Sequence, residues 1–173
     1  MHVSEARIGE RGLLANRITQ GFLLVIVAGS LCISGCGGRM PEALAESSGR
    51  LAPCPASPNC VSSEATDALH AIPAYQIRGD AGAVWTALGK HVRAIPRVEI
   101  VTAEDDYLHV VFTSRLMRYR DDVELELDAE SGVIRLRSAS RVGYGDMGVN
   151  RERMESIRAS MVEGGFVEAP GDR

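Results

Sequence analysis

The sequence lacks the features of a disordered chain. Its 173 residues contain no run of like charges and no low-complexity tract, and charged residues make up an ordinary 24%. Aromatic residues are few, at 5%. A chain of this length buries one hydrophobic core rather than two. We therefore expect a single globular domain with appendages.

The sequence also lacks the familiar motifs of catalysis. It has no Gly-x-Ser-x-Gly elbow and no His-Glu-x-x-His helix, and the histidines at His70, His91 and His109 stand singly in different predicted elements. No set of Cys and His residues has the spacing of metal ligands. We expect neither a metal ion nor a cofactor.

One uncharged run stands near the N-terminus, at residues 21–35, with the sequence GFLLVIVAGSLCISG. Three arginines precede it and polar sequence follows, which is the pattern of a secretory signal. The run of fifteen residues is shorter than the roughly 20 that a membrane-spanning helix needs, so a permanent transmembrane helix is the less favoured alternative. We predict that residues 1–35 are a signal peptide.

The run ends in Ile33-Ser34-Gly35-Cys36, which is an aliphatic residue, two small residues and a cysteine. This segment resembles the lipobox of bacterial lipoproteins, whose cysteine receives diacylglycerol and becomes the first residue of the mature chain. The resemblance implies lipidation at Cys36 and a membrane anchor that faces the periplasm. It favours the outer over the inner membrane, because Gly37 rather than Asp follows the cysteine. The alternative is an ordinary signal peptide with a chance cysteine.

Removal of residues 1–35 takes away three arginines and two glutamates, which leaves 16 basic and 21 acidic residues and a net charge of −5. That balance argues against nucleic acid or anionic lipid as the main partner. Residues 36–52 mix Gly, Ser, Pro, Ala and charge without periodicity, as in a flexible tether. We predict a lipidated tether at 36–52, one globular domain at 53–165 and a C-terminal tail at 166–173.

After processing, two cysteines remain for pairing, Cys54 and Cys60. Three prolines stiffen residues 53–58, which suits a tight loop closed by a disulfide in an oxidising periplasm. A redox motif needs Cys-x-x-Cys, and a zinc site needs more ligands than His70 alone. We predict a structural disulfide between the two cysteines.

The body of the chain begins with a predicted strand at Tyr75–Arg78. Asp80 then caps a helix that Pro96 ends. Apolar residues at three- and four-residue steps give this helix a buried face, namely Val84, Trp85, Leu88 and Val92. We expect Trp85 to be the core anchor rather than a stacking platform for a ligand.

After Pro96 the hydrophobic period changes to two, which predicts four antiparallel strands. They lie at residues 98–102, 108–112, 123–128 and 133–137. A four-residue turn joins the last two into a hairpin. Its register places Glu126 opposite Arg135 and Glu124 opposite Arg137. We expect these four charges to form cross-strand pairs on an exposed face.

A final helix is predicted at residues 150–163, with Asn150 as its N-cap and Gly164 at its end. Its buried stripe consists of Met154, Ile157 and Met161. The predicted fold is therefore α+β, an antiparallel sheet of about five strands with two helices packed on one face, in the order β-α-β-β-β-β-α.

Three separated segments resemble the domain of unknown function 1499 family. They are residues 54–63 (CPASPNCVSS), Asp121-Asp122-Val123-Glu124, and residues 137–151 (RSASRVGYGDMGVNR). The resemblance covers Cys54 to about Val162, and three motifs in the same order make it specific. It implies a fold and a bacterial-envelope or plastid context, and it implies no reaction.

The segment at residues 137–151 is the predicted site. Its Gly143-x-Gly145-x-x-Gly148 spells a dinucleotide fingerprint, but no second parallel strand with an acidic residue follows, so we expect no nucleotide. Amides at a helix start, flanked by guanidinium groups, can hold a phosphate, sulfate or carboxylate. The structural alternative is a capped turn whose arginines pair with acidic neighbours. The candidate ligand-binding residues, which include a charge-rich strand connection, are Arg118, Asp121, Asp122, Arg137, Ser138, Ser140, Arg141, Asp146, Asn150 and Arg151.

Two functions from different classes fit these residues. The favoured one is a membrane-anchored envelope lipoprotein that acts as a binding or scaffold module and recognises a small anionic ligand or an envelope protein. The alternative is a hydrolase or lyase with Asp121, Asp122 or Asp146 as acid or base. Convergence in one concave pocket would favour a site, and scattered local pairs would favour the scaffold; the residues that decide this are Arg118, Asp122, Arg141 and Asp146.

Overall fold

A computed structural model describes residues 51–171 of the chain. The predicted signal peptide, the predicted lipidation at Cys36 and nearly all of the predicted tether lie outside the described residues. Within residues 51–171, neither helix is long and apolar enough to cross a membrane.

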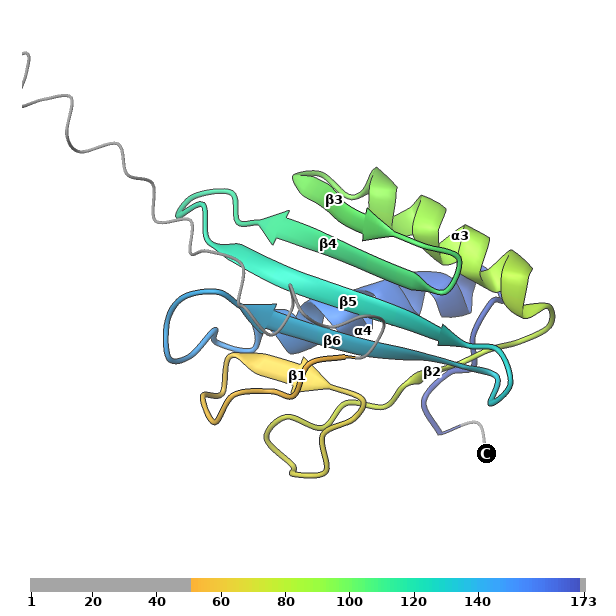
Figure 1. Cartoon of the computed structure of the whole chain (residues 1–173), viewed down its shortest axis with the longest axis horizontal. Helices are drawn as coiled ribbons and strands as arrows, with labels where there is room; N and C mark the ends of the chain where they lie inside the picture. Colours follow the sequence, from red (N-terminus) through yellow and green to blue (C-terminus); the bar gives the residue numbers. More distant parts are fainter. Residues whose placement is uncertain (1–50, 172–173) are drawn as a thin grey trace, which may run out of the picture. The chain divides into compact units, whose positions relative to one another are not determined.

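The described chain forms six strands and two helices (Figure 1). In chain order they are β1 (Cys60–Ser62), β2 (Tyr75–Gln76), α3 (Ala81–Ala94), β3 (Val98–Ala103), β4 (Tyr107–Thr113), β5 (Arg120–Asp128), β6 (Val133–Ser140) and α4 (Val149–Glu163). The strands pair antiparallel in the order β1-β6-β5-β4-β3, and β2 also pairs with β6. The predicted α+β class is confirmed, and the sheet has six strands rather than about five.

The additional strand is β1, which the alternation of side chains does not predict. It has three residues and follows the proline-rich loop, so it is too short to show a period of two. Its pairing partner is distant in the sequence, because Cys60 lies opposite Ala139 of β6. Long-range pairing, and not local pattern, therefore creates this strand.

Both helices pack against one face of the sheet and share one core, as predicted. Val84, Leu88 and Val92 of α3 are buried in the same cluster as Met154 and Ile157 of α4. The sheet contributes the apolar residues of its central strands, Leu108, Val110, Val123, Leu125, Ile134 and Leu136. Each fully buried side chain of this kind stabilises the fold by roughly 1.5–3 kcal/mol. Figure 1 shows α4 passing behind the sheet.

The predicted cap of α3 is confirmed, because the Asp80 side chain accepts a hydrogen bond of 2.7 Å from the amide of Ala83. The expectation for Trp85 is wrong in part. Leu88 and Val92 have no exposed surface, whereas Trp85 is only partly buried and packs at the margin of the core. The row of residues four apart faces the sheet, and Trp85 lies beside that row.

The predicted hairpin register is confirmed, with Glu124 opposite Arg137 and Glu126 opposite Arg135. The expectation that all four charges are exposed is wrong, because Glu124 and Arg137 are buried. They lie on central strands, and the Tyr107 side chain of the neighbouring strand β4 contacts Glu124 on the same face. Cross-strand neighbours therefore remove this pair from solvent.

The chain remains packed beyond residue 165, the predicted end of the globular domain. Phe166 packs against the core and Val167 is buried. The amide of Arg78 donates to the carbonyl of Phe166 at 2.8 Å, and Val167 forms an antiparallel bridge with Ile77.

Candidate functional site

The candidate residues divide between the two faces of the sheet, because successive side chains on a strand point in opposite directions. We call the face that carries the helices the helix face and the opposite one the open face. On β5, Asp121 points to the helix face and Asp122 to the open face. On β6, Ser138 and Arg137 separate in the same way. The candidate residues therefore do not form one site.

On the helix face, a buried polar cluster surrounds the side chain of Asn150. Its Oδ1 accepts hydrogen bonds of 2.6 Å from Ser138 Oγ and from Arg153 Nη1. Arg153 Nη2 also donates to Asp121 Oδ2 at 2.5 Å. The Arg153 guanidinium thus neutralises Asp121, the one carboxylate on this face of β5. Its central carbon, Cζ, also lies 4.8 Å from the ring centroid of Phe112, in a cation–π contact.

The amide nitrogen of Asn150 extends the same cluster toward the N-terminal loop. Asn150 Nδ2 lies 3.0 Å from the carbonyl oxygen of Asn59, 3.0 Å from Ser140 Oγ and 2.7 Å from Asp146 Oδ2. Asn150 is only 1% exposed, and the amide oxygen and nitrogen of its side chain are both hydrogen-bonded. Asn150 is therefore a structural junction between three segments.

The start of α4 differs from the prediction. Gly148 is the N-cap, with a φ of 84° that favours glycine, and Asn150 is inside the helix, so the prediction of Asn150 as N-cap is wrong. The carboxylate of Asp146 accepts hydrogen bonds from the amides of Gly148 at 3.0 Å and of Asn150 at 2.9 Å. The chain therefore supplies its own anion to the positive end of the helix dipole.

This environment shifts the pKa of Asp146. Partial burial raises the pKa, but the hydrogen bonds from the amides of Asn150 and Gly148 lower it more, and the result is a pKa below the ordinary value of 3.8. At neutral pH the carboxylate is ionised. An external anion at these amides must displace it.

On the open face, Arg141 binds Asp122 with two hydrogen bonds. Arg141 Nε lies 2.8 Å from Asp122 Oδ2 and Nη2 lies 2.7 Å from Oδ1. His109 Nε2 of β4 lies 2.8 Å from the same Oδ1. Burial raises the pKa of Asp122, but the hydrogen bonds from His109 and Arg141 outweigh it and hold the pKa below the ordinary value. The bidentate pair is the strongest geometry for this interaction.

A second buried group lies beside the first, around Glu124. Its carboxylate accepts a hydrogen bond of 2.8 Å from Arg137 Nη1 and one of 2.9 Å from the hydroxyl of Tyr107. Burial raises the pKa of Glu124 above the ordinary value in spite of the attraction of Arg137. Within residues 51–171, Arg137 Nε is one of two buried side-chain nitrogen or oxygen atoms without a hydrogen-bond partner.

The two remaining candidates are apart from these groups. Arg151 of α4 donates to the carbonyl oxygens of Ala71 at 2.9 Å and Leu69 at 3.2 Å, so it fastens the loop before β2 to the helix. Arg118 is exposed in the loop between β4 and β5. The guanidinium groups of the candidate set therefore have separate surroundings and do not converge in one pocket.

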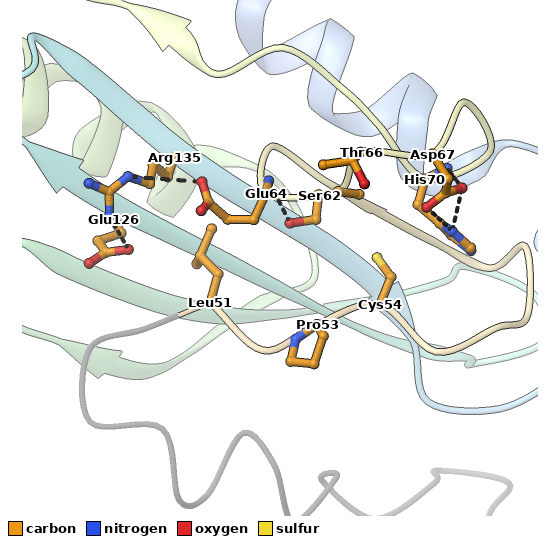
Figure 2. Close-up of a pocket in the computed structure, with 11 residues that line it drawn as sticks. Leu51, Pro53, Cys54, Ser62, Glu64, Thr66, Asp67, His70, Glu126 and Arg135 are labelled. Carbon is orange, nitrogen blue, oxygen red and sulfur yellow. Dashed lines mark hydrogen bonds and ion pairs between the residues drawn. The ribbon is translucent and has the colours of Figure 1, made fainter.

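A cavity of about 750 Å³ lies on the open face, next to the residues described above (Figure 2). Leu51, Pro53 and Cys54 form one wall. The polar part of the lining consists of Ser62, Glu64, Thr66, Asp67, His70, Glu126 and Arg135. Three carboxylates against one guanidinium make this cavity suitable for a cationic or hydroxyl-rich ligand. Of these lining residues, the sequence placed only Glu126 and Arg135 on this face, through the hairpin register.

The side chains in the cavity interact with one another. Arg135 lies 3.4 Å from Glu126 and 3.9 Å from Glu64, and it also pairs with Asp128. Asp67 lies 2.9 Å from Nδ1 of His70. The cavity lining is therefore preorganised by the ion pairs of Arg135 and by the hydrogen bond between Asp67 and His70.

The predicted disulfide is confirmed. Cys54 and Cys60 are bonded, with their Cα atoms 5.7 Å apart, which is an ordinary separation. Because Cys60 belongs to β1 and Cys54 lines the cavity, the bond holds the cavity wall against the edge of the sheet. No group of three or more His, Cys, Asp or Glu residues suited to a metal ion occurs within residues 51–171.

The architecture is that of a small α+β domain, a six-stranded antiparallel sheet covered by two helices and closed at its N-terminal edge by a disulfide. A family model described as protein of unknown function (DUF1499) matches residues 50–161. The chain belongs to this family. Neither a curated protein nor a solved structure gives a significant match.

Proposed function

We propose that this chain is a periplasm-facing bacterial lipoprotein, anchored through Cys36, whose domain is a binding or scaffold module rather than an enzyme. The observation that carries the proposal is the engagement of the three carboxylates that a hydrolase or lyase would use. Asp121 is paired with Arg153, Asp122 with Arg141 and His109, and Asp146 with the amides at the start of α4.

A general acid must carry a proton near neutral pH, an efficient general base has a pKa close to that range, and either needs an oxygen within reach of substrate. The pKa values of Asp122 and Asp146 lie below the ordinary value, so both groups hold no proton at neutral pH. Asp121 and Asp122 are also buried. These carboxylates serve as structural anions, and a binding role needs none of them to react.

The sequence supports the anchor, and the disulfide supports the compartment. Ile33-Ser34-Gly35-Cys36 follows an apolar run of signal-peptide length. A disulfide between Cys54 and Cys60 suits an oxidising compartment such as the periplasm. Gly37 after the lipidated cysteine favours the outer membrane. The membrane through the lipid and an envelope protein or small ligand are the proposed partners.

The ligand has two possible positions. The open-face cavity, with Glu64, Asp67 and Glu126 in its lining, favours a cationic or hydroxyl-rich ligand. A small anion at residues 137–151 is the narrower form of the proposal. It requires the anion to displace Asp146 from its amides or Asp122 from Arg141.

Mass spectrometry of the full-length protein, purified from membranes in mild detergent, tests the proposal. We expect a mature N-terminus at Cys36 with the added mass of a diacylglyceryl group, and a small molecule that stays bound under native conditions. Cys36→Ser is the matched control and is expected to remain an unlipidated precursor or a soluble form. Normal acylation and membrane partition of Cys36→Ser would refute the anchor.

A further inference from the structure

The exposed apolar side chains of this domain are concentrated at one place. Within residues 51–171, nine large hydrophobic residues are exposed, and six of them lie in two segments. They are Leu116, Met117 and Tyr119 in the loop between β4 and β5, and Tyr144, Met147 and Val149 at and before the start of α4. Leu116 is 88% exposed, Tyr144 78% and Met147 101%. Single exposed apolar residues are normal, but a cluster of this kind marks an interaction surface.

The two loops emerge from the same end of the sheet. Asp121 at the start of β5 pairs with Ser140 at the end of β6, and the amide of Arg141 donates to the carbonyl of Arg120 at 3.0 Å. In Figure 1 both loops lie at the left end of the sheet, and the turn between β5 and β6 lies at the right end. We call residues 114–119 together with residues 143–149 the loop tip.

The loop tip also carries unpaired positive charge. Arg115 and Arg118 are exposed, and within the described part of the chain neither guanidinium has an ion pair or a hydrogen bond. Residues 114–119 contain no acidic residue. The one acid in the other loop, Asp146, is bound to the amides of α4. The loop tip is therefore cationic, although the mature chain has a net charge of −5 after removal of residues 1–35.

Two exposed side chains at the loop tip project from a strained backbone. Arg118 has a φ of 56° and Met147 a φ of 55°, in the left-handed region that favours glycine. Bulky residues occupy this region at a cost, and such outliers are concentrated at functional sites. Folding alone does not require a methionine at position 147, because the residue is fully exposed and buries no apolar surface in the core.

From these observations we propose that the loop tip docks on an anionic phospholipid surface. The apolar side chains of Leu116, Tyr144 and Met147 would enter the interface between headgroups and acyl chains, and Arg115 and Arg118 would bind lipid phosphates. This inference rests on the proposed lipid anchor. Cys36 and Leu51 are fifteen residues apart, so the connecting chain spans at most about 50 Å and keeps the domain near the bilayer.

A lipid surface fits the loop tip better than a protein partner does. The most exposed side chains project from two separate loops, a form that suits insertion between mobile lipids. A specific protein interface instead centres on a packed, desolvated set of anchors. Unpaired guanidinium groups beside apolar side chains match the order of phosphate and hydrocarbon in a bilayer.

The test uses the full-length lipidated protein with one added cysteine that carries an environment-sensitive fluorophore. Leu116→Cys reports on the loop tip, and Glu130→Cys, in the exposed turn at the opposite end of the sheet, is the matched control. The proteins are reconstituted in vesicles of phosphatidylethanolamine and phosphatidylglycerol, or of phosphatidylcholine alone. We expect a blue shift and quenching by brominated acyl chains at position 116 in the anionic vesicles, and neither at position 130.

Two further variants probe the proposed contacts with the label at position 116. Arg115→Gln with Arg118→Gln is expected to shift the docking equilibrium roughly fivefold per arginine removed. Met147→Gly is expected to reduce docking without a loss of thermal stability. A label at position 116 that stays in water like the label at position 130, as it would if the loop tip bound a protein, overturns the proposal. Mass spectrometry of the same samples reports acylation separately, so failure of the anchor and failure of docking are distinguishable.

Discussion

Asn59 and Asn150 are 91 positions apart in the sequence, yet the side-chain amide of Asn150 donates to the backbone carbonyl of Asn59 at 3.0 Å. The side chain of Asn59 itself donates to the carbonyl of Gly143 at 2.7 Å. Asn59 immediately precedes Cys60 of the disulfide. These two hydrogen bonds join the disulfide loop to α4 and to the segment that leads into it.

Replacement of Asn150 by Ala is expected to destabilise the fold by about 3 kcal/mol, because it removes several buried hydrogen bonds and leaves polar neighbours without partners. Urea unfolding at neutral pH measures the change. Ser156→Ala, at an exposed position of the same helix, is the control and should change stability by less than about 0.5 kcal/mol. Equal effects for the two variants would contradict the role of Asn150 as a structural junction.

The variant Arg141→Ala distinguishes an anion-binding role of Arg141 from a purely structural one. If Arg141 serves only to hold Asp122, the variant loses about 3 kcal/mol of stability. The reason is that, of the two partners Arg141 and His109, the buried carboxylate of Asp122 then keeps only His109. The melting temperature of the variant falls, and neither wild type nor variant responds to phosphate, sulfate or carboxylates in a thermal-shift panel. We expect this outcome. A rise in the wild-type melting temperature with one of these anions, abolished in Arg141→Ala, would instead favour the anion site.

The cap at Asp146 predicts a dependence of stability on pH. Its pKa in the folded state is lower than the ordinary 3.8, so its contribution to stability is fully present above pH 3.8 and is lost as the pH falls through the folded value. Asp146→Asn removes the charge and keeps an oxygen acceptor. The difference in unfolding free energy between wild type and Asp146→Asn should therefore be largest near neutral pH and shrink below pH 3.8. A difference that grows on acidification would contradict this assignment.

Met147→Gly is expected to raise stability by about 1 kcal/mol, because glycine occupies the left-handed region without the steric cost that a methionine bears there. Thermal and urea unfolding provide the measurement. Met117→Gly is the matched control, since Met117 is also exposed but is not among the residues with a positive φ. It should gain nothing and lose a few tenths of a kcal/mol or more through added chain entropy. A destabilised Met147→Gly would show that the methionine is needed for folding.

Features that depend on neighbours in the chain were determined by the sequence. The cap of α3 by Asp80 and the register of the β5–β6 hairpin follow from short-range geometry, namely a side chain three residues from an amide and a turn of fixed length. The bond between Cys54 and Cys60 follows from the number and spacing of the cysteines that the predicted processing leaves for pairing. In each case the partners are close enough in sequence for local rules to identify them.

Contacts between distant segments were decided only by the tertiary structure. β1 exists because the chain before Ser62 returns to the free edge of β6, and no local period marks it. Glu124 and Arg137 are buried because their strands are central in the sheet, a position that the hairpin alone does not fix. The carboxylate of Asp146, and not the side chain of Asn150, accepts hydrogen bonds from the amides at the start of α4. The Asn150 side chain is held instead by Ser138 and Asn59, which come from other parts of the fold. Periodicity and turns record local energies, whereas burial and the partners of polar side chains depend on which distant segments complete the core.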